Sequence, residues 1–347
     1  MRLGLAVANE GPLKETVGLA RTAEELGVGE VWVPESSHGR SVTSVVATLA
    51  AHTRRIGLGV GIVNPFWRHP SLIAMEAATL DEAADGRLRG IGLGAGLWTL
   101  EALGEADERT RRPLPAMVEA IKIVRAMLRD EPGPNAEIFT VRPDAALSFE
   151  PLRRHVPIYV GAVNQRMLQA TGALADGAYL GAITSPGYTR WAASQLGWGA
   201  ARAGRETGSV DLIANVLTSV ATDARAARAA VKPVLAYYLW RVDGVVTDQA
   251  GADLEAVAEV RRTVAAQGAQ AGAARVSDHL VEVFAAAGDP EQVAQRLRRY
   301  AQAGLDGALA WHVLGPDPSE GLRLLAQQVW PLLAAEPDQA LNPEGGR

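Results

Sequence analysis

Short runs of apolar residues alternate along the chain with longer segments in which apolar residues recur every three or four positions. The short runs predict β-strands, and the longer segments predict amphipathic helices. The predicted strands span residues 2–8, 30–34, 56–63, 88–93, 157–161, 178–183, 212–221 and 308–313. The predicted helices between them include residues 13–26, 70–84, 113–129, 166–174 and 291–303. Because strands that alternate with helices pair in parallel, this order predicts an α/β fold of βα repeats.

Helix ends carry recurring residue types. The segments 25–29, 84–86, 175–177 and 303–307 each place glycine at a predicted helix end and then lead into an apolar strand. We expect a left-handed glycine at each of these stops, because glycine adopts that conformation without steric cost. At the start of the helix predicted at residues 291–303, Asp289 is the predicted N-cap, followed by Pro290 and by Gln292 three residues after the cap.

The eight predicted strands indicate a closed (β/α)8 TIM barrel, with an open doubly wound sheet as the alternative. The open sheet usually carries a glycine-rich first βα turn, whereas residues 9–12 contain one glycine. We therefore predict a single barrel domain over residues 1–335, with a helical insertion at about 224–287 between strands seven and eight. Within it, residues 224–240 and 253–267 have helical periodicity. Residues 336–347 are expected to form a flexible C-terminal tail.

Composition narrows the class of protein. The chain has 347 residues, of which 48% are hydrophobic and 21% charged, and this balance is typical of a globular protein. It contains no cysteine, which excludes disulfides and cysteine-ligated metals and fits a reducing cytoplasm. The net charge of -5 without a basic cluster argues against nucleic acid as a partner. Every long apolar stretch is interrupted by charge or glycine, so no membrane partner is expected.

Barrel enzymes place their chemistry at the carboxyl ends of the strands. After strand two comes the polar run Glu35-Ser36-Ser37-His38-Gly39-Arg40, which is consistent with a site and equally with a solvated loop. Strand three ends in Gly59-Val60-Gly61-Ile62-Val63-Asn64-Pro65. Its glycines leave room for a bulge or for a planar ligand against the backbone.

Two further strand ends are poor in side chains. Strand four has glycine at every second position, at residues 90, 92, 94 and 96. This spacing is not the GxGxxG dinucleotide motif, and we expect it to leave one strand face bare and make space inside the barrel. After strand five, Gly161-Ala162-Val163-Asn164 leads into a helix. Backbone N–H groups at a helix start can hold an anion, although ordinary capping explains the residues as well.

Several chemistries are excluded by missing residues. None of the lysines, Lys14, Lys122 and Lys232, follows a strand end, which argues against a Schiff-base enzyme. The six histidines show no HxH or HExxH spacing, so no metal site is expected. Neither a GxSxG motif nor a phosphate-binding Walker loop is present. We infer that the reactive chemistry belongs to a bound cofactor.

The chain resembles the bacterial luciferase-like superfamily in seven segments taken in order. These are Trp32-Val33-Pro34-Glu35, residues 58–65, Ala78-Thr79-Leu80-Asp81-Glu82, residues 85–94, Pro157-Ile158-Tyr159-Val160-Gly161-Ala162, Ala175-Asp176-Gly177 and Ala287-Gly288-Asp289-Pro290-Glu291. Within the superfamily it is most similar to the methylenetetrahydromethanopterin-reductase-type branch, which uses the deazaflavin coenzyme F420. The resemblance implies a homodimer, a cofactor lying across the strand ends and a small-molecule substrate.

The resemblance also implies roles for individual residues. A non-proline cis peptide is expected at Gly61-Ile62, behind the central ring of the cofactor, with Asn64 near the hydroxylated edge of that ring. Glu35 and Ser36 are expected beside the ring. The implied cofactor-binding set is Ser36, Gly61, Ile62, Val63, Asn64, Gly94, Gly161, Ala162, Val163, Asn164, Gly181 and Ala182. The loop from Gly161 to Asn164 is expected to carry the cofactor phosphate.

The chain departs from the pattern of its relatives at two positions. Ser36 and Leu97 stand where relatives commonly carry histidine and a carboxylate, so the proton donor stays open. We predict Glu35 and His38 as the polar catalytic groups. The leading hypothesis is a coenzyme F420-dependent oxidoreductase that exchanges hydride with a carbon of a small organic substrate. The alternatives are an FMN-dependent monooxygenase of the same fold and a non-catalytic flavin-binding barrel.

The substrate cannot be identified from the sequence. Five aromatic residues are expected in or near the mouth loops, where they either shape an apolar pocket or pack in the core. They are Phe66, Trp67, Trp98, Trp198 and Trp240.

Overall fold

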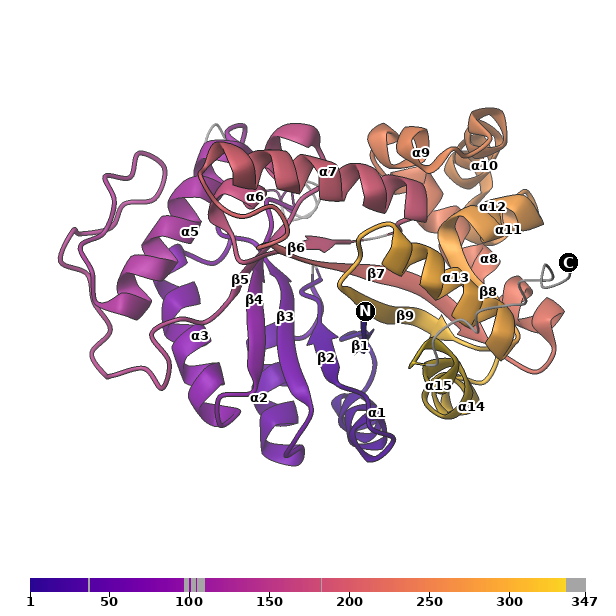
Figure 1. The fold of residues 1–347 in the computed structure, drawn as a ribbon, viewed down its shortest axis with the longest axis horizontal. Helices are drawn as coiled ribbons and strands as arrows, with labels where there is room; N and C mark the ends of the chain where they lie inside the picture. Colours follow the sequence, from indigo (N-terminus) through magenta and orange to yellow (C-terminus); the bar gives the residue numbers. More distant parts are fainter. Residues whose placement is uncertain (37, 97–99, 101–103, 105–109, 182, 335–347) are drawn as a thin grey trace, which may run out of the picture.

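The computed structural model describes residues 1–36, 38–96, 100, 104, 110–181 and 183–334. In this part of the chain, eight parallel strands form a closed barrel in the order β1, β2, β3, β4, β5, β6, β7 and β9 (Figure 1). The strands are β1 (Arg2–Ala6), β2 (Glu30–Val33), β3 (Gly57–Val63), β4 (Leu88–Leu93), β5 (Ile158–Gly161), β6 (Gly177–Leu180), β7 (Asp211–Val220) and β9 (Gly307–Leu314). The predicted (β/α)8 barrel is therefore confirmed, and the open sheet is excluded.

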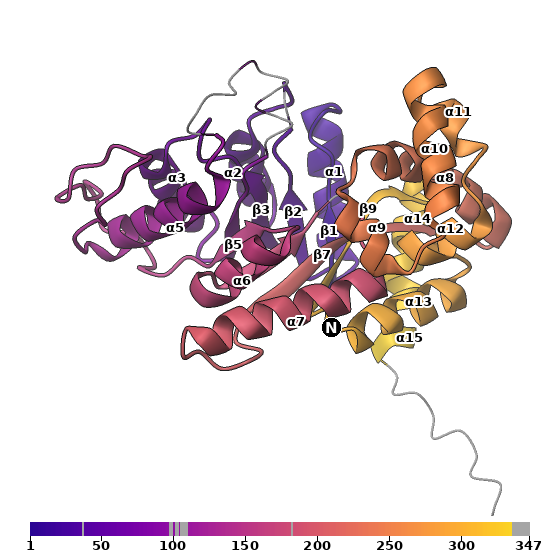
Figure 2. The ribbon, with the colours of Figure 1, turned by 90° about the horizontal axis from the view of Figure 1, so that it is seen from above.

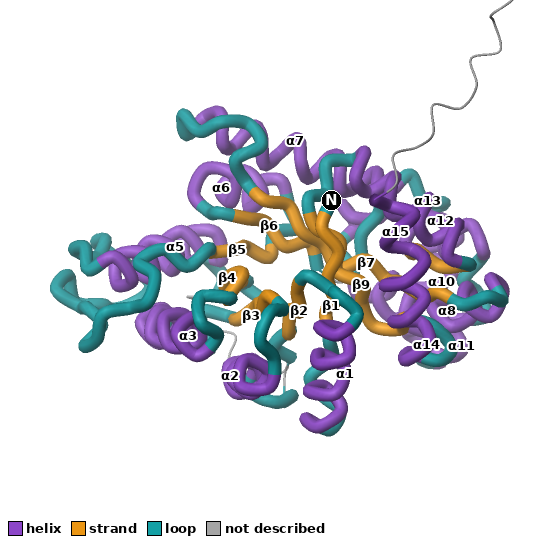
Figure 3. The backbone as a smooth tube through the Cα atoms, turned by 60° about the horizontal axis from the view of Figure 1, so that its bottom comes forward, coloured by secondary structure: helices purple, strands orange, loops and turns teal. Residues whose placement is uncertain are grey.

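Helices surround the barrel, as Figure 3 shows. The outer layer consists of α1 (Leu13–Glu25), α2 (Val42–His52), α3 (Pro70–Ala83), α5 (Pro113–Arg129), α6 (Gln165–Leu174), α7 (Pro186–Arg202), α13 (Pro290–Gln302) and α14 (Pro318–Leu324). A π-helical turn (Leu325–Val329) and α15 (Trp330–Ala334) continue from α14. None of the described helices is both long and apolar enough to cross a membrane.

The connection between β7 and β9 contains most of the additional structure. It holds α8 (Ala224–Arg241), α9 (Gly244–Ala250), α10 (Leu254–Gln267), α11 (Ala269–Ala273) and α12 (Asp278–Phe284). These helices gather at the end of the molecule opposite α3 and α5 (Figure 2). A ninth strand, β8 (Ala285–Gly288), pairs with β7 outside the barrel. The sequence analysis missed it because its Ala-Ala-Ala-Gly sequence has low β propensity.

The predicted helix stops are correct at three of four places. Gly27, Gly86 and Gly304 have φ of 82°, 74° and 95°, as expected for left-handed glycines. The stop at residues 175–177 is different, because Gly177 is the first residue of β6. A Cβ atom there would lie 2.2 Å from Tyr159 Cε1, so close packing is what requires this glycine. The predicted N-cap is confirmed: Asp289 accepts a hydrogen bond from Gln292 N at 2.9 Å.

Aromatic rings fill the barrel interior. Trp32, which is fully buried, lies 5.0 Å from Tyr159 and 5.5 Å from Tyr179 between ring centroids. A Cβ atom at Gly59 would lie 2.2 Å from the Trp32 ring, and one at Gly90 would lie 2.7 Å from the Tyr159 ring. The expectation that strand glycines leave open space inside the barrel is therefore wrong at Gly59 and Gly90. These glycines make room for the rings of Trp32 and Tyr159, which with Tyr179 fill the barrel below its mouth. We call these three rings the aromatic floor.

Candidate functional site

The end of β3 contains the feature on which the site is built. The peptide bond between Gly61 and Ile62 is cis, as the family resemblance implied. The Ile62 side chain extends over β4 and β5, and a Cβ atom at Gly94 would lie 1.8 Å from its Cδ1 atom. A Cβ atom at Gly161 would lie 2.6 Å from the same atom. Gly94 therefore does not leave a bare strand end, because Ile62 occupies the space.

The surface of this part of the mouth is consequently apolar and contains few side chains. Gly61, Val63 and Gly94 are buried, whereas Ile62 is half-buried. The expected contact at the ends of β3, β4 and β5 is therefore with the branched side chain of Ile62 and not with bare backbone.

Asn64 connects two loops of the mouth. Its Nδ2 atom donates to Ala95 O at 2.7 Å, and its Oδ1 atom accepts from Phe66 N at 2.9 Å. The residue is only 6% exposed. Its amide therefore holds the loop after β3 against the loop after β4, beside the place where a ligand was predicted to approach.

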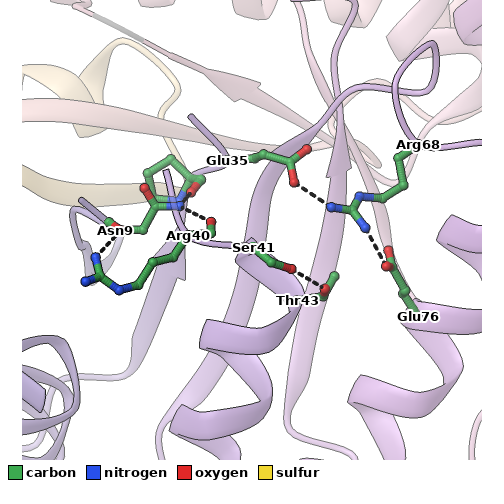
Figure 4. A network of polar contacts seen from close by, with 8 residues as sticks. Asn9, Glu35, Arg40, Ser41, Thr43, Arg68 and Glu76 are labelled. Atoms are coloured by element: carbon green, nitrogen blue, oxygen red, sulfur yellow. Dashed lines mark hydrogen bonds and ion pairs between the residues drawn. The ribbon is translucent and has the colours of Figure 1, made fainter. Parts of the chain in front are cut away.

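An arginine between two carboxylates organises the next part of the site (Figure 4). Arg68, in the loop after β3, donates to Glu35 Oε1 at 2.7 Å and to Glu76 Oε1 at 2.5 Å. Glu35 follows β2, and Glu76 lies on α3. The side chains of Glu35, Arg68 and Glu76 are 6%, 17% and 16% exposed. The ion pairs therefore hold the loop after β2 against the loop after β3.

The network contains two carboxylates and one guanidinium, so its formal charges do not sum to zero. Burial opposes the charge on Arg68, but the hydrogen bonds and charges of Glu35 and Glu76 outweigh it and raise the pKa of the guanidinium. Burial raises the pKa of Glu76, against the lowering effect of Arg68. Within the described residues, Glu35 Oε2 is buried without a hydrogen-bond partner. Glu35 is thus held by one oxygen and keeps an unused acceptor on the other.

Asn9, which the sequence analysis overlooked, orders the polar loop after β2. Its side chain is buried and donates to Pro34 O at 2.7 Å and to Arg40 O at 3.0 Å. Ser36 Oγ donates to Asn9 Oδ1 at 2.9 Å. Arg40 returns from the other end of the loop and donates to Glu10 O at 2.8 Å. Ser36 is therefore fixed in place by the loop after β1.

His38 lies apart from these networks. It is exposed and has a left-handed φ of 61°. Among the described residues it makes no hydrogen bond or ion pair with Glu35 or Arg68. The structure therefore brings Glu35 and Ser36 into ordered positions but does not bring His38 into contact with them.

The predicted phosphate loop lies between β5 and α6. Asn164 is the N-cap residue of α6, but its side chain makes no capping hydrogen bond. It donates instead to Asp243 Oδ2 at 3.3 Å, which links the loop to the insertion. Tyr188 donates to Val163 O at 2.9 Å, and Ala162 is buried. The loop is thus fixed from two sides, while the start of α6 has no side-chain cap of its own.

Other predicted positions are more scattered. A Cβ atom at Gly181, after β6, would meet nothing within 4 Å, so space is open there. Ala182, Leu97 and Trp98 lie outside the described residues. Trp67 is 45% exposed after β3, but Trp198 lies near the end of α7, where the Arg202 guanidinium stacks on it at 4.7 Å. The expectation that Trp198 is near the mouth is therefore wrong.

The described residues contain no group of three or more metal-ligating side chains, and they also show a cleft beside the end of β9, with His312 and Leu314 in its lining. This cleft of about 570 Å³ lies between α1 and α14, with Glu15 and Arg323 among its lining residues. Its floor is the outer face of β1, where Leu5 and Val7 lie. It lacks the ordered polar network of the mouth, so the mouth is the better candidate site.

Arg68 and Asn9 were not predicted as functional residues because each contacts a partner from a distant part of the sequence. Arg68 lies 33 residues from Glu35 in the sequence, and Asn9 lies 27 residues from Ser36. Neither spacing marks a motif. A systematic reading of the first residues after every strand would have found Asn9, three residues beyond the end of β1, but no local signal identifies Arg68 and Glu76 as partners.

Comparison with known proteins gives full-length similarities. Residues 1–307 match the family model described as luciferase-like monooxygenase. The chain is 30% identical to 5,10-methylenetetrahydromethanopterin reductase of Archaeoglobus fulgidus, over 96% of this chain and 100% of that protein. It is 26% identical to F420-dependent glucose-6-phosphate dehydrogenase of Microbacterium testaceum, over 96% and 97% of the two chains. The structure of coenzyme F420-dependent tetrahydromethanopterin reductase from Methanopyrus kandleri superposes with a TM-score of 0.87 at 25% identity, covering 95% and 98%.

Replacing Arg68 by methionine tests the network. Glu35 and Glu76 would stay buried without a counter-charge, and we expect the free energy of unfolding at neutral pH to fall by about 3–5 kcal/mol. Without the cation, Glu76, whose pKa burial already raises, should have a still higher pKa in the folded than in the unfolded protein. Such a group favours folding at low pH and loses that contribution as the pH rises. The loss should therefore shrink as the pH falls toward the ordinary glutamate pKa of about 4.3.

Urea denaturation at several pH values measures this effect, with Arg112→Met as the control. Arg112 forms an ion pair with Glu137 at 3.2 Å in which both side chains are more than half exposed. An exposed pair contributes about 0–1 kcal/mol. Equal losses in the two variants, or a loss at Arg68 that does not change with pH, would contradict the role given to this residue.

Proposed function

The chain belongs to the luciferase-like monooxygenase family, and we propose that within this family it is a coenzyme F420-dependent oxidoreductase. It exchanges hydride between the deazaflavin and a carbon of a small organic substrate. The observation that carries this conclusion is the full-length similarity, in sequence and in fold, to F420-dependent reductases. The similarity extends through the insertion as well as the barrel, so it covers the region that surrounds the mouth.

The residues of the mouth fit a planar cofactor with an anionic tail. Ile62 presents an apolar surface supported by Gly61, Val63 and Gly94, and this surface suits a flat ring. We propose that Asn64, which is bonded to Ala95 O, and Ser36, which is bonded to Asn9, lie beside the ring. We propose that the tail lies along Gly161, Ala162, Val163, Asn164, Gly181 and Ala182. The start of α6, which has no side-chain cap, supports an anion there, because its N–H groups carry the positive end of the helix dipole.

The deazaflavin, when bound, supplies a two-electron hydride carrier. The residues of this chain have to position the substrate and exclude water. We propose that Glu35 is one of the polar groups that border the reactants. Arg68 fixes its Oε1 atom, and its Oε2 atom, like that of Glu76, is buried without a hydrogen-bond partner among the described residues. His38 is proposed as the second polar group, since it lies three residues further along the same loop.

Direct titration distinguishes coenzyme F420 from FMN. We expect the purified apoprotein to bind F420 with a dissociation constant at least about tenfold below that for FMN, a difference of about 1.4 kcal/mol. Quenching of tryptophan fluorescence measures both constants under the same conditions. Tight FMN binding without measurable affinity for F420 would overturn the proposed function and favour the monooxygenase alternative. Cofactor binding without turnover of any acceptor would favour the non-catalytic barrel.

Two glutamates that share one arginine provide a matched pair of variants. Glu35→Gln should slow hydride transfer from reduced F420 by at least about tenfold, because it alters the group proposed to contact the reactants. Glu76→Gln should change the rate far less, since Glu76 lies on α3. Stopped-flow oxidation of reduced F420, with the fastest acceptor from a panel of ketones, quinones and imines, measures the rates. Unchanged kinetics in Glu35→Gln or in His38→Ala would remove that residue from the site.

We also propose that the protein is a homodimer. Leu72 and Met75 are 41% and 48% exposed on α3, and residues three apart on a helix lie on one face. An exposed apolar pair of this kind supports a protein contact. Light scattering should give the mass of two chains, and the variant Leu72→Glu/Met75→Glu should shift it toward one. A monomeric wild-type protein would contradict the proposal.

A further inference from the structure

An aromatic cluster lines the side of the mouth formed by β9 and the insertion. We call it the aromatic wall, and it consists of Tyr238 of α8 with Trp311 and His312 of β9, while Tyr237 and Trp240 lie beside it on α8. The Tyr238 ring lies 4.8 Å from Trp311 and 5.9 Å from His312, between centroids. Tyr237 lies 5.1 Å from Tyr238 and 6.2 Å from Trp240. Trp311 is buried, Tyr238 is half-buried, and His312 is exposed.

The barrel order places this wall opposite the predicted cofactor surface. In the ring of eight strands, β9 is four positions from β4 in either direction. Ile62 projects over β4, whereas Trp311 and His312 belong to β9. Ile62 and Tyr238 both pack against the same interior cluster, which includes Trp32, Tyr179 and Trp311. The two side chains therefore pack on the same interior cluster from opposite sides of the barrel.

The backbone at the end of β9 orients the wall. Successive side chains of a regular strand point to opposite faces of the sheet. The rings of the successive residues Trp311 and His312 instead contact each other at 4.7 Å. His312 has a φ of 75° and Leu314 a φ of 59°, and the pairing of β9 with β7 changes register beyond Trp311. Such a backbone is unfavourable for residues other than glycine, so it points to a functional requirement for this arrangement.

The hydroxyl of Tyr238 is distinguished from those of the other five tyrosines. Tyr159, Tyr179, Tyr188 and Tyr300 donate to Asp211, Asn215, Val163 O and Thr184 O. The Tyr237 hydroxyl accepts a hydrogen bond from Arg241 at 3.0 Å. Within the described part of the chain, the Tyr238 hydroxyl has no hydrogen-bond partner. Burial raises its pKa, so it remains a protonated donor at neutral pH.

We propose that the aromatic wall binds the substrate and selects a planar, conjugated carbonyl compound. The ring of the compound stacks on Tyr238 and His312, and its carbonyl oxygen accepts a hydrogen bond from the Tyr238 hydroxyl. The substrate then lies between the wall and the cofactor surface over Ile62, with its electrophilic carbon facing the deazaflavin. This inference rests on the proposed function for the cofactor, but the wall itself is defined by this chain alone.

Two ketones of similar size test the inference. 1,4-Naphthoquinone is planar and conjugated, and 1-decalone is a saturated bicyclic ketone. Their dissociation constants are measured by tryptophan fluorescence for the apoprotein and for the protein loaded with oxidised F420. The chain has no cysteine, so the quinone cannot add to a thiol. Four proteins are compared: wild type, Tyr238→Ala, Tyr238→Phe, and Tyr237→Phe as the control whose hydroxyl already has a partner.

We expect the quinone to bind the wild type more tightly than decalone does. Tyr238→Ala should weaken quinone binding by roughly tenfold through lost stacking, and Tyr238→Phe by roughly threefold or more through the lost hydrogen bond. Tyr237→Phe should stay within about twofold of wild type, and the affinity for F420 should not change in any variant. Tighter quinone binding by Tyr238→Phe than by Tyr238→Ala would separate the contribution of ring stacking from that of the hydroxyl hydrogen bond.

Quinone affinity unchanged in Tyr238→Ala, or decalone binding as tight as quinone binding, would overturn the inference. The experiment distinguishes failure of the proposed F420 dependence from failure of the aromatic wall. A wild-type protein that binds quinone but not F420 contradicts the proposed function and leaves the wall supported. A protein that binds F420 but not quinone, in either the apo or the loaded form, contradicts the wall alone.

Discussion

The packing of Trp32 against the backbone of Gly59 determines the depth of the barrel mouth. No Cβ atom fits between them, because one on Gly59 would lie 2.2 Å from the indole. With Tyr159 and Tyr179, the indole fills the interior and excludes a ligand from the lower barrel. Inside the barrel, a ligand can therefore bind only above these rings. Such a ligand would contact the side chains that pack on these rings, which are Ile62 on one side and Tyr238 on the other.

The two sides of the mouth are built in different ways. On the side of β3 to β5, glycines let Ile62 lie flat across the strand ends, and the loops around it are joined by Asn64 and by the Arg68 network. On the side of β9, aromatic side chains from the insertion cover the strand end. The first surface suits a flat cofactor with little need for side-chain hydrogen bonds. Among the described residues, the second has a Tyr238 hydroxyl without a hydrogen-bond partner next to the exposed His312 ring, and these suit a substrate that must be recognised.

Much of the fold could be predicted from the sequence, because apolar periodicity and helix-end residues are local signals. The barrel, most element bounds and the Asp289 cap are of this kind. The meaning of the strand glycines could not be predicted, since a glycine shows that a side chain is excluded but not which atoms fill the space. The ion pairs of Arg68 with Glu35 and Glu76 form only because two loops and a helix meet in the folded protein. Strand β8 is recognisable only by its pairing with β7.

The most direct test of the account is a crystal structure of the protein loaded with coenzyme F420. We predict that the deazaflavin ring lies on Ile62, above the rings of Trp32, Tyr159 and Tyr179, with its phosphate at residues 161–164 and one face turned toward Tyr238. A ring bound instead in the cleft between α1 and α14, or a mouth in which protein side chains cover Ile62 and leave no room for the ring, would contradict it.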